Sequence, residues 1–258
     1  MSQRIALVTG GSRGLGRATA LALADSGVDV ILTYRSGAEQ AAEVVAAIGA
    51  VGRRAVALPL ETTDLASHAA FAEQVRTALA DIWGRDSFDQ LMNNAGSSGE
   101  TPIGATDADE VQRLFDVHFR SVVMLTQELL PLLADEGRIL NVSTGLTLNL
   151  VNPAYSVYAA MKAAVEVYSR YLAKSLGARG IAVNVLAPGA TATDFGGGSI
   201  RDNEQYRAGI IASSAMGRVG EPDDIGRAAA AILSEGMGWV TGQRIEAAGG
   251  QGMGFVGR

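Results

Sequence analysis

Residues 4–25 read RIALVTGGSRGLGRATALALAD and contain a short apolar run, a glycine-rich turn and an alanine-rich segment of helical spacing. The pattern predicts a strand over Arg4–Val8 and a helix over Gly14–Asp25. Between them lies Thr9-Gly10-Gly11-Ser12-Arg13-Gly14-Leu15-Gly16, whose glycines leave room for a phosphate to approach backbone N–H groups and a helix N-terminus. The turn alone is also compatible with a tight strand-to-helix connection that binds no ligand.

The rest of the chain continues this alternation of β-branched runs and alanine-rich helical segments, most of them followed by glycine or proline. Such an order is typical of a parallel sheet covered by helices on both faces. The expected strands are Arg4–Val8, Val28–Thr33, Arg54–Leu58, Gln90–Asn93, Arg138–Val142, Ala182–Leu186 and Gln243–Glu246. The expected helices are Gly14–Asp25, Ala38–Ile48, Ser67–Ile82, Asp107–Leu133, Tyr155–Leu176 and Asp223–Leu233. The predicted fold class is α/β, a doubly wound parallel sheet of about seven strands.

No internal repeat or linker interrupts this order, so residues 1–258 are predicted to form a single domain. One long stretch, Ala190–Pro222, contains Gly196-Gly197-Gly198 and shows no clear period, which predicts an irregular segment. Segments of this size in compact domains are usually functional loops. We therefore expect a mobile substrate loop at about 190–222, with an inert loop as the alternative.

Composition and charge exclude several classes of function. The net charge is −6 and no basic run is present, so the chain offers no electrostatic footprint for nucleic acid. The chain has no cysteine, and its two histidines, His68 and His118, are far apart, which argues against a metal site. No targeting signal or long apolar run is visible, and we expect a soluble cytoplasmic protein that does not enter a membrane.

Further motifs follow the glycine-rich turn in a fixed order. They are Asn93-Asn94-Ala95-Gly96, Tyr158-x-x-x-Lys162, Pro188-Gly189 with Thr193, and Thr241-Gly242-Gln243 followed by Gly249-Gly250. Together with Thr-Gly-x-x-x-Gly-x-Gly in the turn, they resemble the short-chain dehydrogenase/reductase family along nearly the whole chain. The resemblance implies a single Rossmann-like NAD(P)-binding domain, an oxidoreductase acting on a carbonyl or alcohol, and a homo-oligomer, either a dimer or a tetramer.

The end of the second expected strand indicates which cofactor is bound. An NAD site usually has a carboxylate there for the ribose 2′-hydroxyl, whereas a 2′-phosphate calls for a cation. The segment reads Tyr34-Arg35-Ser36, without an acid, and Arg13 in the turn adds a second cation. This favours NADP(H) over NAD(H). Glu61-Thr62 stands where the family usually has an aspartate near the adenine.

Tyr158 and Lys162 are four residues apart on an expected helix, so their side chains project from one face. A neighbouring ammonium and an oxidised nicotinamide would lower the pKa of the phenol toward the working pH, which makes Tyr158 the expected general acid/base. By resemblance, Lys162 also holds the nicotinamide ribose. A Tyr/Lys pair alone is a weak signal, since many helices carry such pairs on their surface.

Two positions depart from the family pattern. The family's catalytic serine hydroxyl corresponds to Thr144 in this sequence, with Ser143 as the alternative. The extra methyl group of a threonine narrows the space for substrate. His118 stands where related sequences commonly have an asparagine that holds a water. An imidazole could hold that water or shuttle protons, and a buried histidine without a catalytic part is the other interpretation.

The predicted catalytic residues are therefore Tyr158, Lys162, Thr144 and His118. The predicted cofactor-binding residues are Gly10, Ser12, Arg13, Gly14, Leu15, Gly16, Tyr34, Arg35, Ser36, Glu61, Thr62, Asn93, Ala95, Gly96, Tyr158, Lys162, Pro188, Gly189, Thr191 and Thr193. Three other functions stay open. They are a non-catalytic dinucleotide sensor, a nucleotide-sugar epimerase or dehydratase, for which the chain looks short, and a 3-oxoacyl-carrier-protein reductase. The acidic turn Ala134-Asp135-Glu136 disfavours docking of an acidic carrier, although Arg179 could serve.

Overall fold

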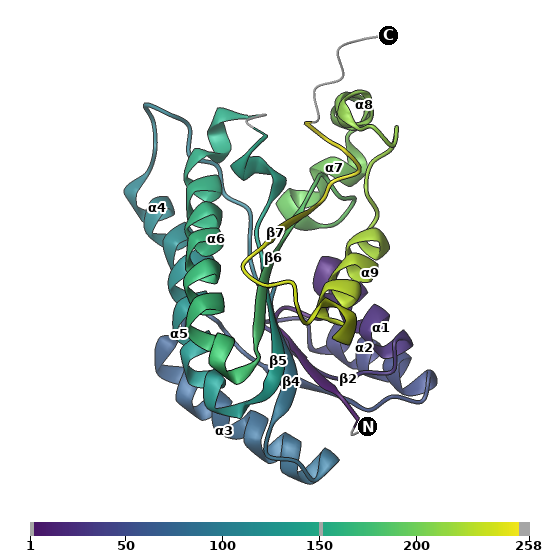
Figure 1. Cartoon of the computed structure of the whole chain (residues 1–258). Coiled ribbons are helices and arrows are strands. Elements are labelled where there is room, and N and C mark those ends of the chain that lie inside the picture. The colour runs from purple at the N-terminus through teal and green to yellow at the C-terminus, as the bar shows by residue number, and fades with distance from the viewer. Residues whose placement is uncertain (1–2, 150–151, 253–258) are drawn as a thin grey trace.

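The computed structural model describes residues 3–149 and 152–252. Its centre is a seven-stranded sheet in the order β3-β2-β1-β4-β5-β6-β7, with every neighbouring pair parallel (Figure 1). The strands are β1 (Ile5–Val8), β2 (Asp29–Tyr34), β3 (Ala55–Pro59), β4 (Phe88–Asn93), β5 (Leu133–Val142), β6 (Ala182–Pro188) and β7 (Arg244–Ala247). The predicted doubly wound α/β fold is confirmed.

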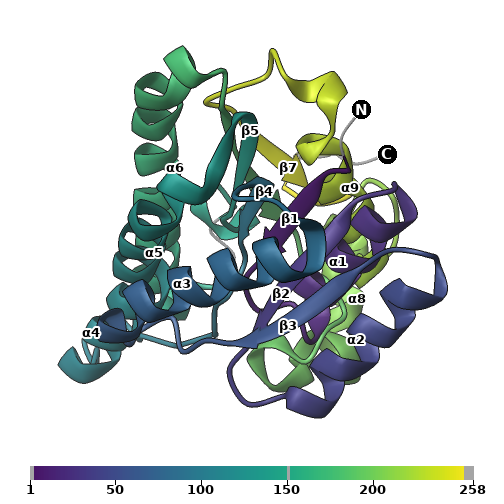
Figure 2. The same ribbon diagram turned by 90° about the horizontal axis from the view of Figure 1, so that it is seen from below.

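Helices cover both faces of the sheet, as Figures 1 and 2 show. They are α1 (Gly14–Asp25), α2 (Ala38–Ala50), α3 (His68–Ala78), α4 (Ala108–Phe115), α5 (Ser121–Leu129), α6 (Ser156–Leu176), α7 (Ser199–Asp202), α8 (Glu204–Ser213) and α9 (Pro222–Leu233). One face carries α1, α2 and α9, and the other carries α3, α5 and α6. None of the helices in the described part of the chain is long and apolar enough to span a bilayer.

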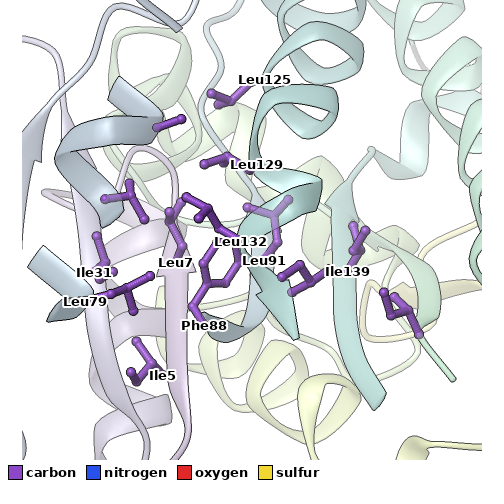
Figure 3. Packing of buried hydrophobic residues seen from close by; sticks show 14 of the residues in the cluster. Ile5, Leu7, Ile31, Leu79, Phe88, Leu91, Leu125, Leu129, Leu132 and Ile139 are labelled. Carbon is purple, nitrogen blue, oxygen red and sulfur yellow. The ribbon is translucent and has the colours of Figure 1, made fainter. Parts of the chain in front are cut away.

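The alternating direction of side chains along each strand divides the apolar residues between two cores. Ile5 and Leu7 of β1 belong to the core under α3, α5 and α6, which Figure 3 shows around Phe88 and Leu91. Val8, one residue further, belongs to the core under α1, α2 and α9. Both faces of the central strands are therefore dry, which explains their nearly continuous apolar sequences.

The strand order reverses between β1 and β4, which lie side by side although two other strands separate them in sequence. In open α/β sheets, ligands bind at the carboxyl ends of the strands where the order reverses. Residues 9–16 leave β1 at that point, and residues 94–99 leave β4 beside them. The topology thus brings two of the predicted motifs together.

The expected helix over Asp107–Leu133 differs from the structure in two ways. A π-helical turn, η3 (Asp116–Arg120), separates α4 from α5, and Leu133 is already the first residue of β5. Pro131 lies in a short 3-10 turn after α5, where a residue without an amide proton ends the α-helical pattern. The periodicity of apolar residues does not reveal a single π turn, because such a turn adds only one residue to the helix.

β5 begins earlier than expected because it contains a wide irregularity. Leu133 pairs with Phe88, and the next pair in the register joins Arg138 to Gln90. The residues between them form the acidic turn, in which Glu136 has a φ of 59°. Arg179 donates to Asp135 over 2.7 Å and also to backbone carbonyls nearby. Its guanidinium is therefore already engaged within the domain.

The stretch Ala190–Pro222, predicted to be irregular, contains two helices, α7 and α8, and ends where α9 begins. Asn203 begins α8 by accepting a hydrogen bond from the Tyr206 amide over 2.9 Å. Before α7, Gly196, Gly197 and Gly198 have φ values of 65°, 70° and 76°, which reverse the chain. The irregular assignment is wrong, whereas the mobility of this segment stays a prediction.

Candidate active site

The glycine-rich turn is held against β2 by its backbone. The Gly10 amide donates to the Thr33 hydroxyl over 3.1 Å, and the Gly11 amide donates to the Thr33 carbonyl over 2.8 Å. Gly10 has a φ of +66°, and a Cβ at Gly16 would overlap the Gly10 carbonyl oxygen. The helix can start this close to the strand only because Gly16 lacks a side chain. The result is a concave backbone surface at the N-terminus of α1, which fits a pyrophosphate.

Asn94, the residue after β4, contacts one side of this turn. The cofactor residues predicted from the sequence do not include it. Asn94 Nδ2 donates to the carbonyls of Thr9 and Gly10 over 2.9 and 3.2 Å. The Thr9 hydroxyl in turn accepts from the amides of Asn94 and Ala95 over 2.9 and 3.0 Å. Ala95 also lies close to the turn, since a Cβ added at Gly10 would be 3.1 Å from its Cα.

Asn93, the predicted cofactor residue of this motif, has its side chain on the opposite side of the strand. Its amide donates to the Asn141 side chain over 2.8 Å and to the Thr126 hydroxyl over 3.0 Å, and the residue is buried. This side chain therefore ties β4 to β5 and α5, and a part for Asn93 in cofactor binding stays a prediction. The alternation along a strand places neighbouring residues on opposite faces, and it could have identified Asn94.

The segment after β6 completes the wall above the turn. Pro188 ends β6, and the Gly189 amide donates to the Ala247 carbonyl over 3.1 Å. The Thr191 hydroxyl donates to the Gly189 carbonyl over 3.0 Å. A Cβ added at Gly14 would lie 3.9 Å from the side chain of Thr193. The structure thus places Thr193 next to the glycine-rich turn, and a contact of Pro188, Gly189 and Thr191 with the cofactor stays a prediction.

One exposed arginine follows β2, where the ribose of a dinucleotide is expected, and a second precedes α1. Arg35 is 69% exposed, and its only ion pair in residues 3–149 and 152–252 is a long one, 3.7 Å from Arg35 Nη1 to Glu61 Oε2. Arg13 precedes α1 and is exposed, as is Ser36. Both guanidinium groups therefore remain available to a phosphate.

The remaining cofactor residues occupy the floor and the edges of the site. Ser12 is half-buried, and Leu15 and Tyr34 pack against the core under α1 and α2. Glu61 accepts from the Thr63 hydroxyl over 2.9 Å, which orients its carboxylate. A small cavity lies between the carboxyl ends of β1, β3 and β4 and the helix α5, and it is lined by Thr9, Thr62, Asn93, Ala95, Ser121, Val122 and Leu125.

Tyr158 and Lys162 are both buried on one face of α6. Lys162 Nζ donates to the Val142 carbonyl over 2.8 Å, and burial lowers the pKa of Lys162 to about 8. Burial raises the pKa of Tyr158, and a hydrogen bond from Thr144 opposes that rise only in part. The sequence predicts that Lys162 lowers the pKa of Tyr158, whereas the pKa of Tyr158 is raised in the structure. The reason is that the Lys162 ammonium is directed at the Val142 carbonyl of β5. Lowering of the phenol pKa by an oxidised nicotinamide stays a prediction.

The two hydroxyls at the end of β5 have different partners. Ser143 Oγ donates to Glu166 Oε1 over 2.6 Å and is directed away from Tyr158. The Thr144 side chain accepts only a longer hydrogen bond, 3.3 Å from the Leu146 amide, and it influences the Tyr158 phenol. Thr144 is therefore the hydroxyl that faces Tyr158, and Ser143 is not.

His118 lies in the π turn η3, and its ring packs edge-on against Tyr158 with 5.0 Å between centroids. Its Nε2 is 2.7 Å from the Ser97 carbonyl, while Nδ1 has no hydrogen-bond partner in the described residues. Burial and the positive charge of Lys162 lower the pKa of His118 to about 2. This lowered pKa favours the neutral imidazole, and a part in a proton shuttle stays a prediction. A role in holding water stays a prediction.

Two aromatic rings lie next to Tyr158, and a third ring, that of Tyr206, lies near Tyr155. The Phe195 and Tyr155 rings lie 6.2 and 6.5 Å from the Tyr158 ring. Phe195 is 45% exposed and precedes the three glycines, and Tyr206 on α8 is 41% exposed. The Tyr155 hydroxyl donates to Glu100 over 3.4 Å. The neighbours of Tyr158 on this side are thus aromatic, with the Glu100 carboxylate next to Tyr155.

A glycine-rich turn at the point of strand reversal, together with a buried tyrosine and a buried lysine on α6, is typical of a dinucleotide-binding α/β oxidoreductase. Comparisons with known proteins agree with this class. Residues 10–251 match the sequence model of a family described as Enoyl-(Acyl carrier protein) reductase. The chain belongs to the short-chain dehydrogenase/reductase family, whose cofactor is a nicotinamide dinucleotide.

Relatives and solved structures cover almost the whole chain. The 3-oxoacyl-[acyl-carrier-protein] reductase FabG of Haemophilus influenzae is 37% identical over 257 residues, which is 97% of this chain and 98% of that protein. An uncharacterized oxidoreductase of Methylorubrum extorquens is 35% identical and covers 96% of this chain and 97% of its own length. The angucycline C-6 ketoreductase LanV with bound NADP superposes with a TM-score of 0.91 at 33% identity, covering 97% of this chain and 96% of its own.

Proposed function

We propose that this protein is an NADP(H)-dependent oxidoreductase that transfers hydride between the nicotinamide and a carbonyl or alcohol, with Tyr158 as general acid/base. One observation carries the proposal. Tyr158, Lys162, Thr144 and His118 meet at one point that adjoins the glycine-rich turn through Ala95 and Gly96. A purely structural use of these side chains gives no reason for a buried lysine and a buried tyrosine to share one face of α6.

The residues of this chain have separable tasks in the proposed reaction. A nicotinamide supplies or accepts the hydride when it is bound. Thr144 donates a hydrogen bond to the carbonyl oxygen as negative charge develops there. Tyr158, whose pKa burial keeps above its usual value, is protonated at neutral pH and gives its proton to that oxygen. Lys162 supplies positive charge beside the phenol and, by family resemblance, holds the ribose hydroxyls.

The cofactor side of the proposal names NADP(H) rather than NAD(H). The exposed guanidinium groups of Arg35 and Arg13 lie at the end of β2 and at the start of α1, and no carboxylate follows Tyr34. Guanidinium groups bind a phosphate through paired, charge-assisted hydrogen bonds. Among the solved relatives, LanV was determined with bound NADP and a metagenomic blue fluorescent protein with NADPH.

The aromatic neighbours of Tyr158 indicate the kind of carbonyl compound. Phe195 and Tyr155 offer flat apolar surface next to Tyr158, which favours an uncharged substrate that carries a ring over a charged one. A second candidate, reduction of a carrier-bound 3-oxoacyl chain, follows from the similarity to FabG. Docking of an acidic carrier would need a free basic side chain such as Arg179. The Arg179 guanidinium already donates to Asp135 and to two backbone carbonyls.

The catalytic proposal is tested by NADPH consumption with a panel of aromatic ketones, quinones and 3-oxoacyl thioesters. Tyr158→Phe should lower kcat by about 100-fold or more, the usual scale for a lost general acid, with NADPH binding retained. Tyr155→Phe is the matched control, because it removes a neighbouring hydroxyl that bonds Glu100, and it should stay within a few fold of wild type. A wild-type protein that binds NADPH and reduces nothing on the panel would favour the dinucleotide sensor.

Cofactor choice is tested separately by fluorescence titration with NADPH and NADH. Arg35→Asp should weaken NADPH binding at least about 10-fold more than NADH binding, since the 2′-phosphate loses a cation and meets an anion. Arg76→Asp on α3 makes the same charge change at a comparably exposed position and should affect neither. Equal losses for both dinucleotides in Arg35→Asp would contradict the phosphate assignment.

A further inference from the structure

An ion pair that the proposed reaction does not use lies behind the catalytic residues. Glu166 is on α6, four residues after Lys162, and its side chain is only 14% exposed. One oxygen of its carboxylate, Oε1, accepts three hydrogen bonds. They come from Ser143 Oγ over 2.6 Å, Thr147 Oγ1 over 2.9 Å and Arg244 Nε over 3.0 Å.

Arg244 brings β7, the last strand of the sheet, into the same network. Its side chain is 18% exposed, and its Nη2 donates to the Thr144 carbonyl and to the Thr147 hydroxyl, each over 3.2 Å. Its Nη1 donates to Glu246 Oε2 over 3.2 Å. One guanidinium therefore joins α6, the turn after β5 and β7. A planar group with several fixed donors is suited to this, whereas a lysine ammonium is not.

These contacts surround Thr144 without engaging its hydroxyl. Glu166 accepts a hydrogen bond from the side chain of Ser143, the residue before Thr144. Arg244 donates to the backbone carbonyl of Thr144 itself. The network leaves the Thr144 hydroxyl to face Tyr158, where it can donate to a substrate oxygen, and the hydroxyl oxygen accepts from the Leu146 amide over 3.3 Å. A hydrogen-bond donor for a developing oxyanion needs its direction fixed in advance, since reorienting it during the reaction would add to the barrier.

We propose that Glu166 and Arg244 are positioning residues, which fix the backbone of Thr144 so that its hydroxyl is aimed at the substrate oxygen beside Tyr158. This inference rests on the proposed function and adds two residues to its site. The pair is nearly buried, so removing one partner would leave the other charge without compensation in a poorly solvated place. The turn at residues 143–147 would then lose the contacts from both α6 and β7.

The test is a kinetic cycle with NADPH and the best carbonyl substrate of the panel. Glu166→Gln should lower kcat about 10-fold, with the KM for NADPH within about twofold of wild type, because misaimed donors cost turnover more than cofactor binding. Arg244→Gln should act in the same way. Glu73→Gln, which removes the acid of an exposed ion pair with Arg76, is the control and should change neither parameter.

A second arm distinguishes positioning from general stability. If Glu166 acts through Thr144, then Glu166→Gln should cause less than a twofold further loss in a Thr144→Ala background. Independent, multiplying losses would overturn the proposal, as would an unchanged kcat in the single variants. If Glu166→Gln does not fold, the double variant Glu166→Gln/Arg244→Gln removes both charges together, and it is combined with Thr144→Ala in the same way.

Hydrogen exchange separates this inference from the proposed function. Glu166→Gln should accelerate amide exchange in residues 143–149 at least about 10-fold and leave α3 and β1 unchanged. This readout needs no substrate, so a protein that reduces no compound on the panel would refute the proposed function and still report on the network. Unchanged exchange at residues 143–149 would refute the positioning role by itself.

Discussion

The imidazole of His118 lies where a positive charge is unfavourable on every side. It is fully buried, Lys162 lies close enough to repel an imidazolium, and Arg113 adds to that effect. The Ser97 carbonyl accepts its one available proton. This environment favours the neutral form of the imidazole beside Tyr158.

This environment predicts an acid-sensitive fold. The pKa of His118 is about 2 in the folded protein and about 6.5 in the unfolded chain, so only the unfolded chain takes up the proton between these values. Its contribution to stability is present above pH 6.5 and falls by about 1.4 kcal/mol per pH unit below it. Urea unfolding at pH 7.5, 6 and 5 should show this fall, and His118→Asn should reduce its slope. An identical slope in both proteins would contradict the assigned pKa.

Neighbouring residues show what the sequence could and could not supply about the site. The fixed spacing and order of the motifs predict that Tyr158, Lys162 and Thr144 lie together, and the structure brings these side chains together, while their roles stay predictions. The motif does not state which asparagine side chain faces the turn, and the contacts of Asn94 with the turn were therefore missed. Glu166 and Arg244 were missed, because 78 residues separate them and only the folded sheet brings them together.

At the scale of the element, the segment from Phe195 to α8 places the Phe195 ring next to Tyr158 and then reverses the direction of the chain. We call this segment the cover. The Phe195 ring is 6.2 Å from the Tyr158 ring, and three glycines with positive φ follow at once. Residues with a Cβ pay a steric penalty in that conformation. The position of the cover therefore depends on the backbone freedom of these glycines.

A pair of glycine substitutions tests this dependence. Gly197 has a φ of +70° and Gly27 a φ of +88°, and a Cβ at either would meet nothing within 4 Å in the described residues. Alanine at either position therefore adds only backbone strain, about 1 to 2 kcal/mol. Gly197→Ala should raise the KM for the carbonyl substrate several-fold, whereas Gly27→Ala should lower only stability. Equal KM values, measured with saturating NADPH, would show that the cover does not depend on this reversal.

The same scale shows the limit of periodicity. The helix over Gly14–Asp25 was predicted residue for residue, because glycine at its start and a clear end bound it. The π turn that contains His118 was not predicted. Nor were α7 and α8, which are too short to show a helical period of apolar residues. Short helices depend on caps such as Asn203 and on contacts with the rest of the fold.

For the whole molecule, the alternation of strands and helices was enough to predict the doubly wound sheet. Parallel strands need crossover connections, and alanine-rich helices of matching length supply them. The observed strand order sets the carboxyl ends of β1 and β4 side by side, which is what brings the motifs into one site. The place of β7 at the sheet edge, and with it Arg244, could not be predicted from local pattern, because it depends on which strand is still unpaired after the others have assembled.

The sheet is also a partition. Leu7 belongs to one core and Val8 to the other, so the side chains of consecutive strand residues pack against different sets of helices. A core substitution in residues 3–149 and 152–252 should therefore disturb mainly the helices of its own face. Changes in the core under α3, α5 and α6 bear directly on the helix that carries Tyr158 and Lys162, whereas changes in the other core bear on α1, where the glycine-rich turn ends.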